Sequence, residues 1–81
     1  MRLDKFLKVS RIIKRRTVAN EACGGGRVQI NGRPAKPGAE VKPGDILEIR
    51  FGEQIGKYEV LSVKEQVGKA EAADVYRVLP Q

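Results

Sequence analysis

The chain has 81 residues, 41% of them hydrophobic, which suits one small domain with a modest core spanning residues 1–81. It has no His and a single Cys, Cys23, so the sequence excludes an internal disulfide and a His/Cys metal site and is typical of a reduced, cytoplasmic protein. The formal net charge is +6 at pH 7, and no run of adjacent apolar residues is long enough for a signal peptide or a membrane span.

Residues 2–9, RLDKFLKV, are predicted to form a helix. At 100° per residue, one stripe collects the side chains of Leu3, Phe6, Leu7 and Ser10. The opposite side carries the basic residues Arg2, Lys5 and Lys8. Asp4 in the first turn suits the positive end of the helix dipole. Ile12 and Ile13 are expected to anchor the turn that follows.

A second helix is predicted to start between Lys14 and Thr17 and to run to about Cys23. Its inward residues are expected to be Val18, Ala19 and Ala22. Thr17 can serve as the N-cap, or Arg16 can already lie in the first turn, and the sequence leaves both open. Three glycines, residues 24–26, are expected to end the helix, because glycine adopts the left-handed cap conformation without steric cost.

The rest of the chain is predicted to form a small, mostly antiparallel sheet. In residues 27–36, RVQINGRPAK, Val28 and Ile30 alternate with polar residues, and Asn31-Gly32 is a hairpin turn signal. A turn is predicted at 42–45, KPGD, and strands at 46–51 and 57–63. One face of the first of these strands is expected to carry Leu47, Ile49 and Phe51. Residues 70–80, AEAADVYRVLP, remain ambiguous between a helix and a strand. The fold class is therefore α+β, with two N-terminal helices packed on the sheet.

Positive charge is concentrated in the first part of the chain. Residues 1–33 hold nine basic and two acidic residues, a net +7, whereas residues 34–81 have a net −1. The stretch SRIIKRRT, residues 10–17, has four basic residues in eight positions. It leads to the start of the second helix, where free backbone N–H groups and the helix dipole also favour phosphate. This pattern predicts a surface that binds a polyanion.

The residue inventory argues against an enzyme. The chain has no His, no pair of cysteines and no Ser in a nucleophile-elbow pattern. The three glycines follow a helix and lack the Lys-Ser/Thr of a nucleotide-binding loop. Cys23 is expected to be a small, buried apolar residue. We therefore predict a protein without catalytic activity and without a metal or other cofactor.

Folded RNA is the polyanion that the pattern favours. Neither predicted helix carries a row of Asn, Gln and Arg suited to reading a DNA major groove, and Asn20 alone is a weak signal. The basic residues come instead from two helix ends and the turn between them. Such a compact surface of mixed origin suits irregular RNA better than a long, uniform duplex.

Several of these pieces occur in the order found in the S4-type RNA-binding domain, which the chain resembles over about residues 1–50. Arg-Leu-Asp stands at residues 2–4, an apolar pair at 6–7 and a basic residue, Arg16, at the start of the second helix. A Gly-x-Val-x-Ile-Asn-Gly segment follows at 26–32, and VKPGDILEI at 41–49 also fits. The resemblance implies an S4-like α+β fold with the helical αL motif.

Among S4-type proteins, the chain is most similar to the short stand-alone bacterial RqcP family, whose members are relatives of a ribosome-binding heat-shock protein. The chain lacks the long basic C-terminal extension of that heat-shock protein. The resemblance implies a monomer that binds the large ribosomal subunit, touching ribosomal RNA and peptidyl-tRNA. It further implies a role in ribosome-associated quality control, in which a partner factor adds a C-terminal alanine tail to the stalled chain.

Carried over onto this sequence, the resemblance makes Arg2 and Arg16 the leading RNA contacts. Supporting contacts are expected from Lys5, Lys8, Arg11, Lys14 and Arg15. Asp4 is expected either to orient a neighbouring arginine or cap a backbone N–H, or to serve only as a partner of the helix dipole. Arg27 and Arg33 either border the patch or are solvated strand ends. Two other functions remain open: a protein-interaction adaptor that uses the sheet, and the RNA-binding module of an RNA-modifying enzyme.

Overall fold

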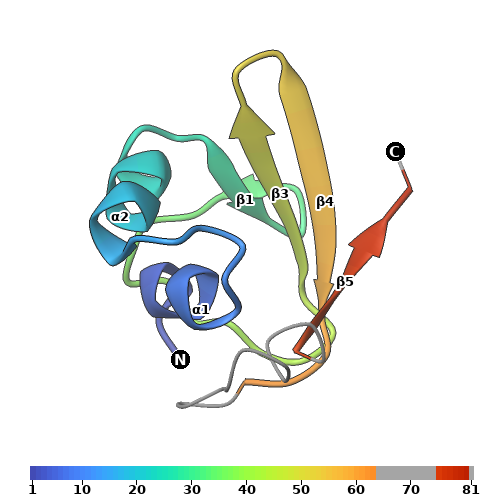
Figure 1. Cartoon of the computed structure of the whole chain (residues 1–81). Helices are drawn as coiled ribbons and strands as arrows, with labels where there is room; N and C mark the ends of the chain where they lie inside the picture. The colour runs from blue at the N-terminus through green and yellow to red at the C-terminus, as the bar shows by residue number, and fades with distance from the viewer. Residues whose placement is uncertain (64–74, 81) are drawn as a thin grey trace.

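The computed structural model describes residues 1–63 and 75–80. Two helices, α1 (Leu3–Val9) and α2 (Arg16–Gly24), precede five strands: β1 (Val28–Ile30), β2 (Arg33–Pro34), β3 (Ile46–Phe51), β4 (Gln54–Val60) and β5 (Tyr76–Leu79). The strands form one sheet in the order β2-β1-β3-β4-β5, with every neighbouring pair antiparallel. Figure 1 shows the two helices side by side and β5 at the far edge of the sheet. The predicted α+β class is confirmed.

Helix α1 presents the apolar stripe that the sequence predicts. Leu3, Phe6 and Leu7 are all fully buried, and so is Ser10. Burial of each large apolar side chain contributes about 1.5–3 kcal/mol. The Ser10 hydroxyl donates to the Leu7 carbonyl at 3.2 Å, so this buried polar group has a partner. The stripe therefore fixes which face of α1 is left for the basic residues.

Helix α2 begins at Arg16, so Thr17 lies inside the first turn and is not the N-cap. The buried positions are Ala19, Ala22 and Cys23, whereas Val18 is 46% exposed. The prediction for Val18 is wrong because the buried stripe is centred on residues spaced three and four apart, which leaves Val18 at its edge. The helix ends as predicted: Gly25 is the C-cap, and Gly26 has a φ of +76°.

Both predicted turns are confirmed. Asn31 and Gly32 have φ values of +53° and +83°, as a two-residue hairpin turn between β1 and β2 requires. The Asn31 side chain also accepts the Ile46 N–H at 2.9 Å, which ties this turn to the start of β3. At residues 42–45, the Asp45 N–H donates to the Lys42 carbonyl at 3.1 Å and Gly44 has a φ of +94°.

Strand β3 has the predicted bounds, but β4 covers residues 54–60 instead of 57–63. Gly52, with a φ of +61°, lets the chain reverse at once, so Phe51 already pairs with Gln54. Pairing therefore begins three residues earlier than the sequence pattern suggests. Phe51 lies on the predicted side of β3 but is 46% exposed, because it stands at the end of the strand beyond the buried Leu47 and Ile49.

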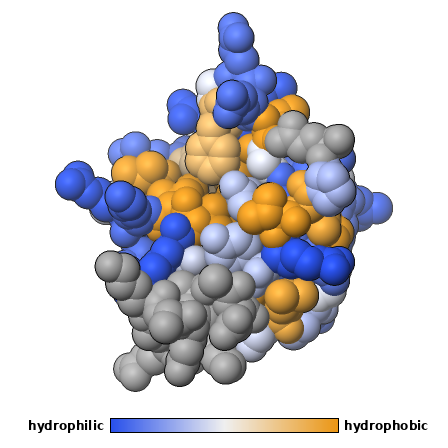
Figure 2. Space-filling model, turned by 45° about the vertical axis from the view of Figure 1, so that its right-hand side comes forward, coloured by the Kyte–Doolittle hydropathy of each residue, from blue (hydrophilic) through white to orange (hydrophobic). Residues whose placement is uncertain are grey.

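Within the stretch 70–80, for which the sequence leaves helix and strand open, residues 76–79 form strand β5. Residues 70–74 lie outside the described residues. Tyr76 in β5 packs edge-to-face on Tyr58 in β4, with ring centroids 5.6 Å apart. Val78 is 64% exposed. Figure 2, in which the right-hand side of Figure 1 is turned forward, shows hydrophobic side chains on this face with hydrophilic side chains around them.

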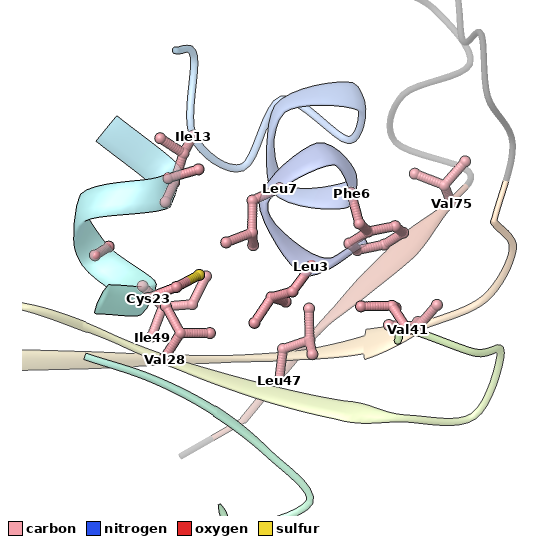
Figure 3. Close-up of a cluster of buried hydrophobic side chains, with 13 residues drawn as sticks. Leu3, Phe6, Leu7, Ile13, Cys23, Val28, Val41, Leu47, Ile49 and Val75 are labelled. Carbon is pink, nitrogen blue, oxygen red and sulfur yellow. The ribbon is translucent and has the colours of Figure 1, made fainter. Parts of the chain in front are cut away.

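The core lies between the helices and one face of the sheet (Figure 3). Side chains of α1 and α2 meet those of β1 and β3, including Val28, Leu47 and Ile49. Cys23 is buried in this cluster, and burial raises the pKa of its thiol to about 11. This supports the prediction that Cys23 acts as a small apolar residue, since a reactive thiol needs a lowered pKa.

Candidate RNA-binding surface

The cations of the first 16 residues all lie on the helical part of the molecule. Arg2 is the residue before α1, and Arg16 opens α2. Six of the seven are exposed, and Lys5 is half-buried; the seven are Arg2, Lys5, Lys8, Arg11, Lys14, Arg15 and Arg16. We call them the helix-side cations. Of these, Arg2, Lys5 and Lys8 are the ones expected on the side of α1 opposite its buried stripe, whereas the other four follow α1 in the turn and at the start of α2.

A buried carboxylate, Asp4, joins Arg2 to Arg16. Arg2 donates from Nε to Asp4 Oδ1 at 3.2 Å and from Nη2 to Oδ2 at 3.3 Å. Arg16 Nε lies 3.5 Å from Asp4 Oδ2. The side chain of Asp4 is 3% exposed, whereas those of Arg2 and Arg16 are 55% and 50% exposed. Asp4 therefore holds the two arginines together from below and leaves half of each in solvent.

Asp4 also accepts two further hydrogen bonds. The backbone N–H of Lys5 donates to Oδ1 at 2.8 Å, and the amide of Asn20 donates to Oδ2 at 3.4 Å. Burial by itself raises the pKa of Asp4, but the Asn20 amide, Arg16, the Lys5 N–H and Arg2 together hold it below its ordinary value. The carboxylate is thus ionised at neutral pH and keeps both guanidinium groups oriented.

Sequence reasoning missed the contribution of Asn20. This residue stands four positions after Arg16, which places both side chains on the same face of α2. Together with Asp4 and Thr17, they line a shallow surface hollow. The i, i+4 spacing from Arg16 indicated that Asn20 lies beside Arg16 on α2. The sequence did not indicate that Asp4 of α1 would contact both residues.

The start of α1 is fixed by the loop that follows β2. The N–H groups of Leu3 and Asp4 donate to the carbonyls of Ala39 and Pro37, at 2.8 and 3.1 Å. Arg2 forms a β-bridge with Glu40. These backbone contacts set where Arg2 and Asp4 stand, so the position of the arginine pair depends on a segment more than 30 residues away in the chain.

Arg11 adopts a left-handed backbone conformation, with a φ of +64°. It lies directly after the C-cap of α1, where glycine is usual and other residues cost roughly 1–2 kcal/mol. No hydrogen bond or ion pair of the Arg11 side chain is present within residues 1–63 and 75–80 to offset this cost. Such a strained residue with a free cationic side chain is typical of a functional position.

Most of the helix-side cations are not neutralised by the protein itself. In the part of the chain that the structure describes, no ion pair involves Lys8, Arg11, Lys14 or Arg15. The Arg15 side chain does not cap α2, and the first turn of this helix contains no acidic residue. Positive side chains here oppose the helix dipole, so a bound anion would stabilise the arrangement.

The two supporting arginines lie apart from this group. Arg33 is exposed in β2 and lines a surface hollow with Ile30 and Lys36. Arg27, before β1, lines a different hollow with residues of β3 and β4. Within the described residues, no group of His, Cys, Asp and Glu could hold a metal ion. No helix in the same ranges is long and apolar enough to cross a membrane.

Comparison with known proteins gives consistent matches. The S4 domain family model matches residues 1–47. A protein of Halalkalibacterium halodurans is 58% identical over 78 residues, covering 96% of this chain and 89% of its own length. A protein of Bacillus subtilis is 52% identical over 81 residues, covering 100% of this chain and 94% of its own. Both are named RQC P-site tRNA stabilizing factor.

The fold is also that of a solved structure. Heat shock protein 15 of Vibrio cholerae, determined as a trimer, superposes with a TM-score of 0.89 at 34% sequence identity. The match covers 98% of this chain and 81% of the other.

Proposed function

The chain belongs to the S4 domain family and to the RQC P-site tRNA stabilizing factors, and we propose from this membership that it binds tRNA in the P site of the large ribosomal subunit during ribosome-associated quality control. In this role it contacts ribosomal RNA and peptidyl-tRNA and catalyses no reaction. We further propose that the protein works in the cytoplasm as a monomer and that residues 1–81 act as one RNA-binding unit. In this role it acts alongside the factor that adds alanine tails.

The observation that carries the proposal is the pair formed by Arg2 and Arg16 over a buried carboxylate. A guanidinium group whose Nε is held by Asp4 still presents donors on its exposed side, in the planar geometry that suits phosphate. Prior orientation reduces the entropy lost when RNA binds. The uncompensated cations around the pair add the sequence-independent attraction that a phosphate backbone requires.

Arg2 and Arg16 are therefore assigned the leading phosphate contacts. The supporting contacts are assigned to Lys5, Lys8, Arg11, Lys14 and Arg15. Asp4 does not touch RNA in this scheme: it positions the two arginines. Arg33 is assigned a contact at the border of the surface, because it lies next to the loop that holds the start of α1.

Co-sedimentation with purified large subunits that carry peptidyl-tRNA tests the proposal. Arg16→Ala is expected to lower affinity at least about tenfold, because it removes an oriented, charge-assisted contact. Arg77→Ala is the matched control: Arg77 is also a half-exposed arginine paired with a carboxylate, Glu59, but lies in the sheet. Equal affinity of the Arg16 variant and the wild type, with both folded, would contradict the proposed surface.

A further inference from the structure

The face of the sheet that points away from the helices carries two neighbouring arginines, Arg27 and Arg50. In the register that pairs Val28 with Ile49, Arg27 lies opposite Arg50, and the Arg50 N–H donates to the Arg27 carbonyl at 2.9 Å. Val28 and Ile49 are buried against the helices. Because side chains alternate along a strand, their neighbours belong to the other face.

Two like charges opposite each other in an antiparallel ladder are destabilising unless a negative group separates them. The carboxylates of this face already have other partners. Lys57 Nζ lies 3.3 Å from Glu48 Oε1, and Arg77 forms an ion pair with Glu59. Across residues 1–63 and 75–80, neither Arg27 nor Arg50 has a carboxylate partner. The pair therefore keeps a local positive charge on a face that is otherwise neutralised.

The two arginines line one hollow of about 260 Å³, which we call the Arg27–Arg50 hollow. Its other lining residues are Gly26, Gln29, Glu48 and Ile55. The guanidinium groups can bind phosphate oxygens in a bidentate manner. The Gln29 amide offers both a donor and an acceptor, which suits a ribose hydroxyl or a base edge. Gly26 has no side chain, so the chain leaves the hollow open just before the start of β1.

We propose that the Arg27–Arg50 hollow is a second RNA-binding site, which takes the phosphate backbone of a strand other than the one at the helix-side cations. This inference rests on the proposed function and extends it. The two cationic regions lie on different faces: the helix-side cations on the helical layer and the hollow on the far face of the sheet. A protein with positive charge on two faces can bridge two RNA segments. Such bridging would allow contact with ribosomal RNA and tRNA at the same time.

Two double variants test the hollow in the co-sedimentation experiment on large subunits that carry peptidyl-tRNA. Arg27→Ala with Arg50→Ala removes the two unpaired cations. Lys57→Ala with Arg77→Ala is the matched control, since it removes two cations from the same face that carboxylates already neutralise. The first variant is expected to bind about tenfold or more weakly, and the slope of log affinity against log salt should fall by about 1.4–1.8 in magnitude. In the control, which leaves Glu48 unpaired beside the hollow, both changes should be far smaller, and thermal unfolding should show that both variants fold.

Photo-crosslinking identifies what occupies the hollow. A photoreactive residue at position 29 is expected to crosslink to ribosomal RNA or tRNA in the assembled complex, whereas one at position 59, on the same face, should not. Crosslinking from position 29 to protein only, or to nothing, would overturn the second site. So would equal loss of binding in the two double variants.

The outcome also separates this inference from the proposed function. If Arg16→Ala releases the protein from the subunit and the Arg27/Arg50 variant binds as tightly as wild type, the second site is wrong and the proposed function stands. If the wild type itself does not bind subunits that carry peptidyl-tRNA, the proposed function fails, and the second site, which rests on it, fails too.

Discussion

The helical layer and the strands β4 and β5 carry charge in opposite ways. On the helical layer, two cations, Arg2 and Arg16, share one buried carboxylate, Asp4, and others have no ion-pair partner within the described residues. On β4 and β5, Lys57 and Arg77 are each paired with a glutamate one strand away. Both regions contain exposed basic residues, but only the helical layer has positive charge left over.

The difference shows that the partners of a charge matter more for binding than the number of charges. An exposed ion pair contributes little to stability and offers little to a polyanion. A buried carboxylate below two arginines acts differently, because it orients them and leaves their outer donors available. Substitutions on the helical layer and in the paired part of the sheet can test this contrast.

The largest effect is expected for Asp4→Asn. The amide keeps the size of the side chain but removes the charge that holds Arg2 and Arg16. We expect a loss of about 1–3 kcal/mol in the free energy of unfolding and at least about tenfold weaker RNA binding. Chemical denaturation and co-sedimentation measure the two effects. RNA binding as tight as wild type would show that the arginines need no positioning.

Asp4 also gives the protein a defined acid sensitivity. Its pKa is lowered by folding, so its contribution to stability is present above its ordinary pKa of 3.8 and is lost as pH falls through the lower folded value. The melting temperature of the wild type should therefore decrease below about pH 4. Asp4→Asn should lack this part of the decrease. If the melting temperatures of the two proteins decreased equally below about pH 4, the prediction would be wrong.

The unpaired cations should contribute through charge alone. Lys14→Ala combined with Arg15→Ala is expected to reduce the magnitude of the salt slope by about 1.4–1.8, with affinity reduced severalfold at moderate salt. Stability should hardly change, since both side chains are exposed. The measurement is affinity for RNA-bearing subunits over a fourfold range of salt. Lys57→Ala with Arg77→Ala again serves as the control. If its salt slope changed as much as that of the Lys14/Arg15 variant, paired and unpaired cations would contribute equally to binding, and the contrast between the two regions would be wrong.

Much of the fold was predictable from the sequence because local signals agree with it. The stripe of Leu3, Phe6 and Leu7, the glycines after α2 and the Asn31-Gly32 turn each specify their structure over a few residues. The prediction of β4 was wrong by three residues because the pattern of apolar residues does not reveal how tightly the chain turns. Gly52 decided that register, and pairing with β3 extended the strand over residues with little apolar pattern of their own.

The candidate surface was predictable only in part. Basic residues near two helix ends indicated where positive charge would gather, and the order of motifs indicated the family. The clustering of Arg2 and Arg16 around Asp4 with Asn20 depends on how α1 crosses α2, and on a loop near residue 37 that fixes α1. Likewise, the pairing of Arg27 with Arg50 depends on the register of β1 on β3, which joins residues 23 positions apart.

A smaller effect is expected at Arg11. Arg11→Gly should raise the free energy of unfolding by about 1 kcal/mol or less, because glycine adopts the left-handed conformation without strain but loses more entropy on folding. RNA affinity should fall a few-fold at the same time. Arg11→Lys keeps the charge, so it should retain affinity without gaining stability. Denaturant titration and binding together detect these opposite changes, and a Gly variant that binds like wild type would leave the strain at Arg11 without a functional reason.

The smallest effect is expected in the sheet, for the pair of Lys57 and Glu48. The Lys57 side chain is 41% exposed, and its Nζ lies 3.3 Å from Glu48 Oε1, so solvent screens most of the attraction. Lys57→Ala should cost less than about 1 kcal/mol. Because it leaves the Glu48 carboxylate unpaired beside the hollow, it should lower RNA affinity only slightly, far less than Arg27→Ala with Arg50→Ala. Glu48→Ala is the more informative partner, because it frees Lys57 beside the Arg27–Arg50 hollow. If the hollow binds RNA, this variant should bind slightly more tightly than wild type at low salt, and the gain should vanish when Arg27 and Arg50 are also replaced by Ala.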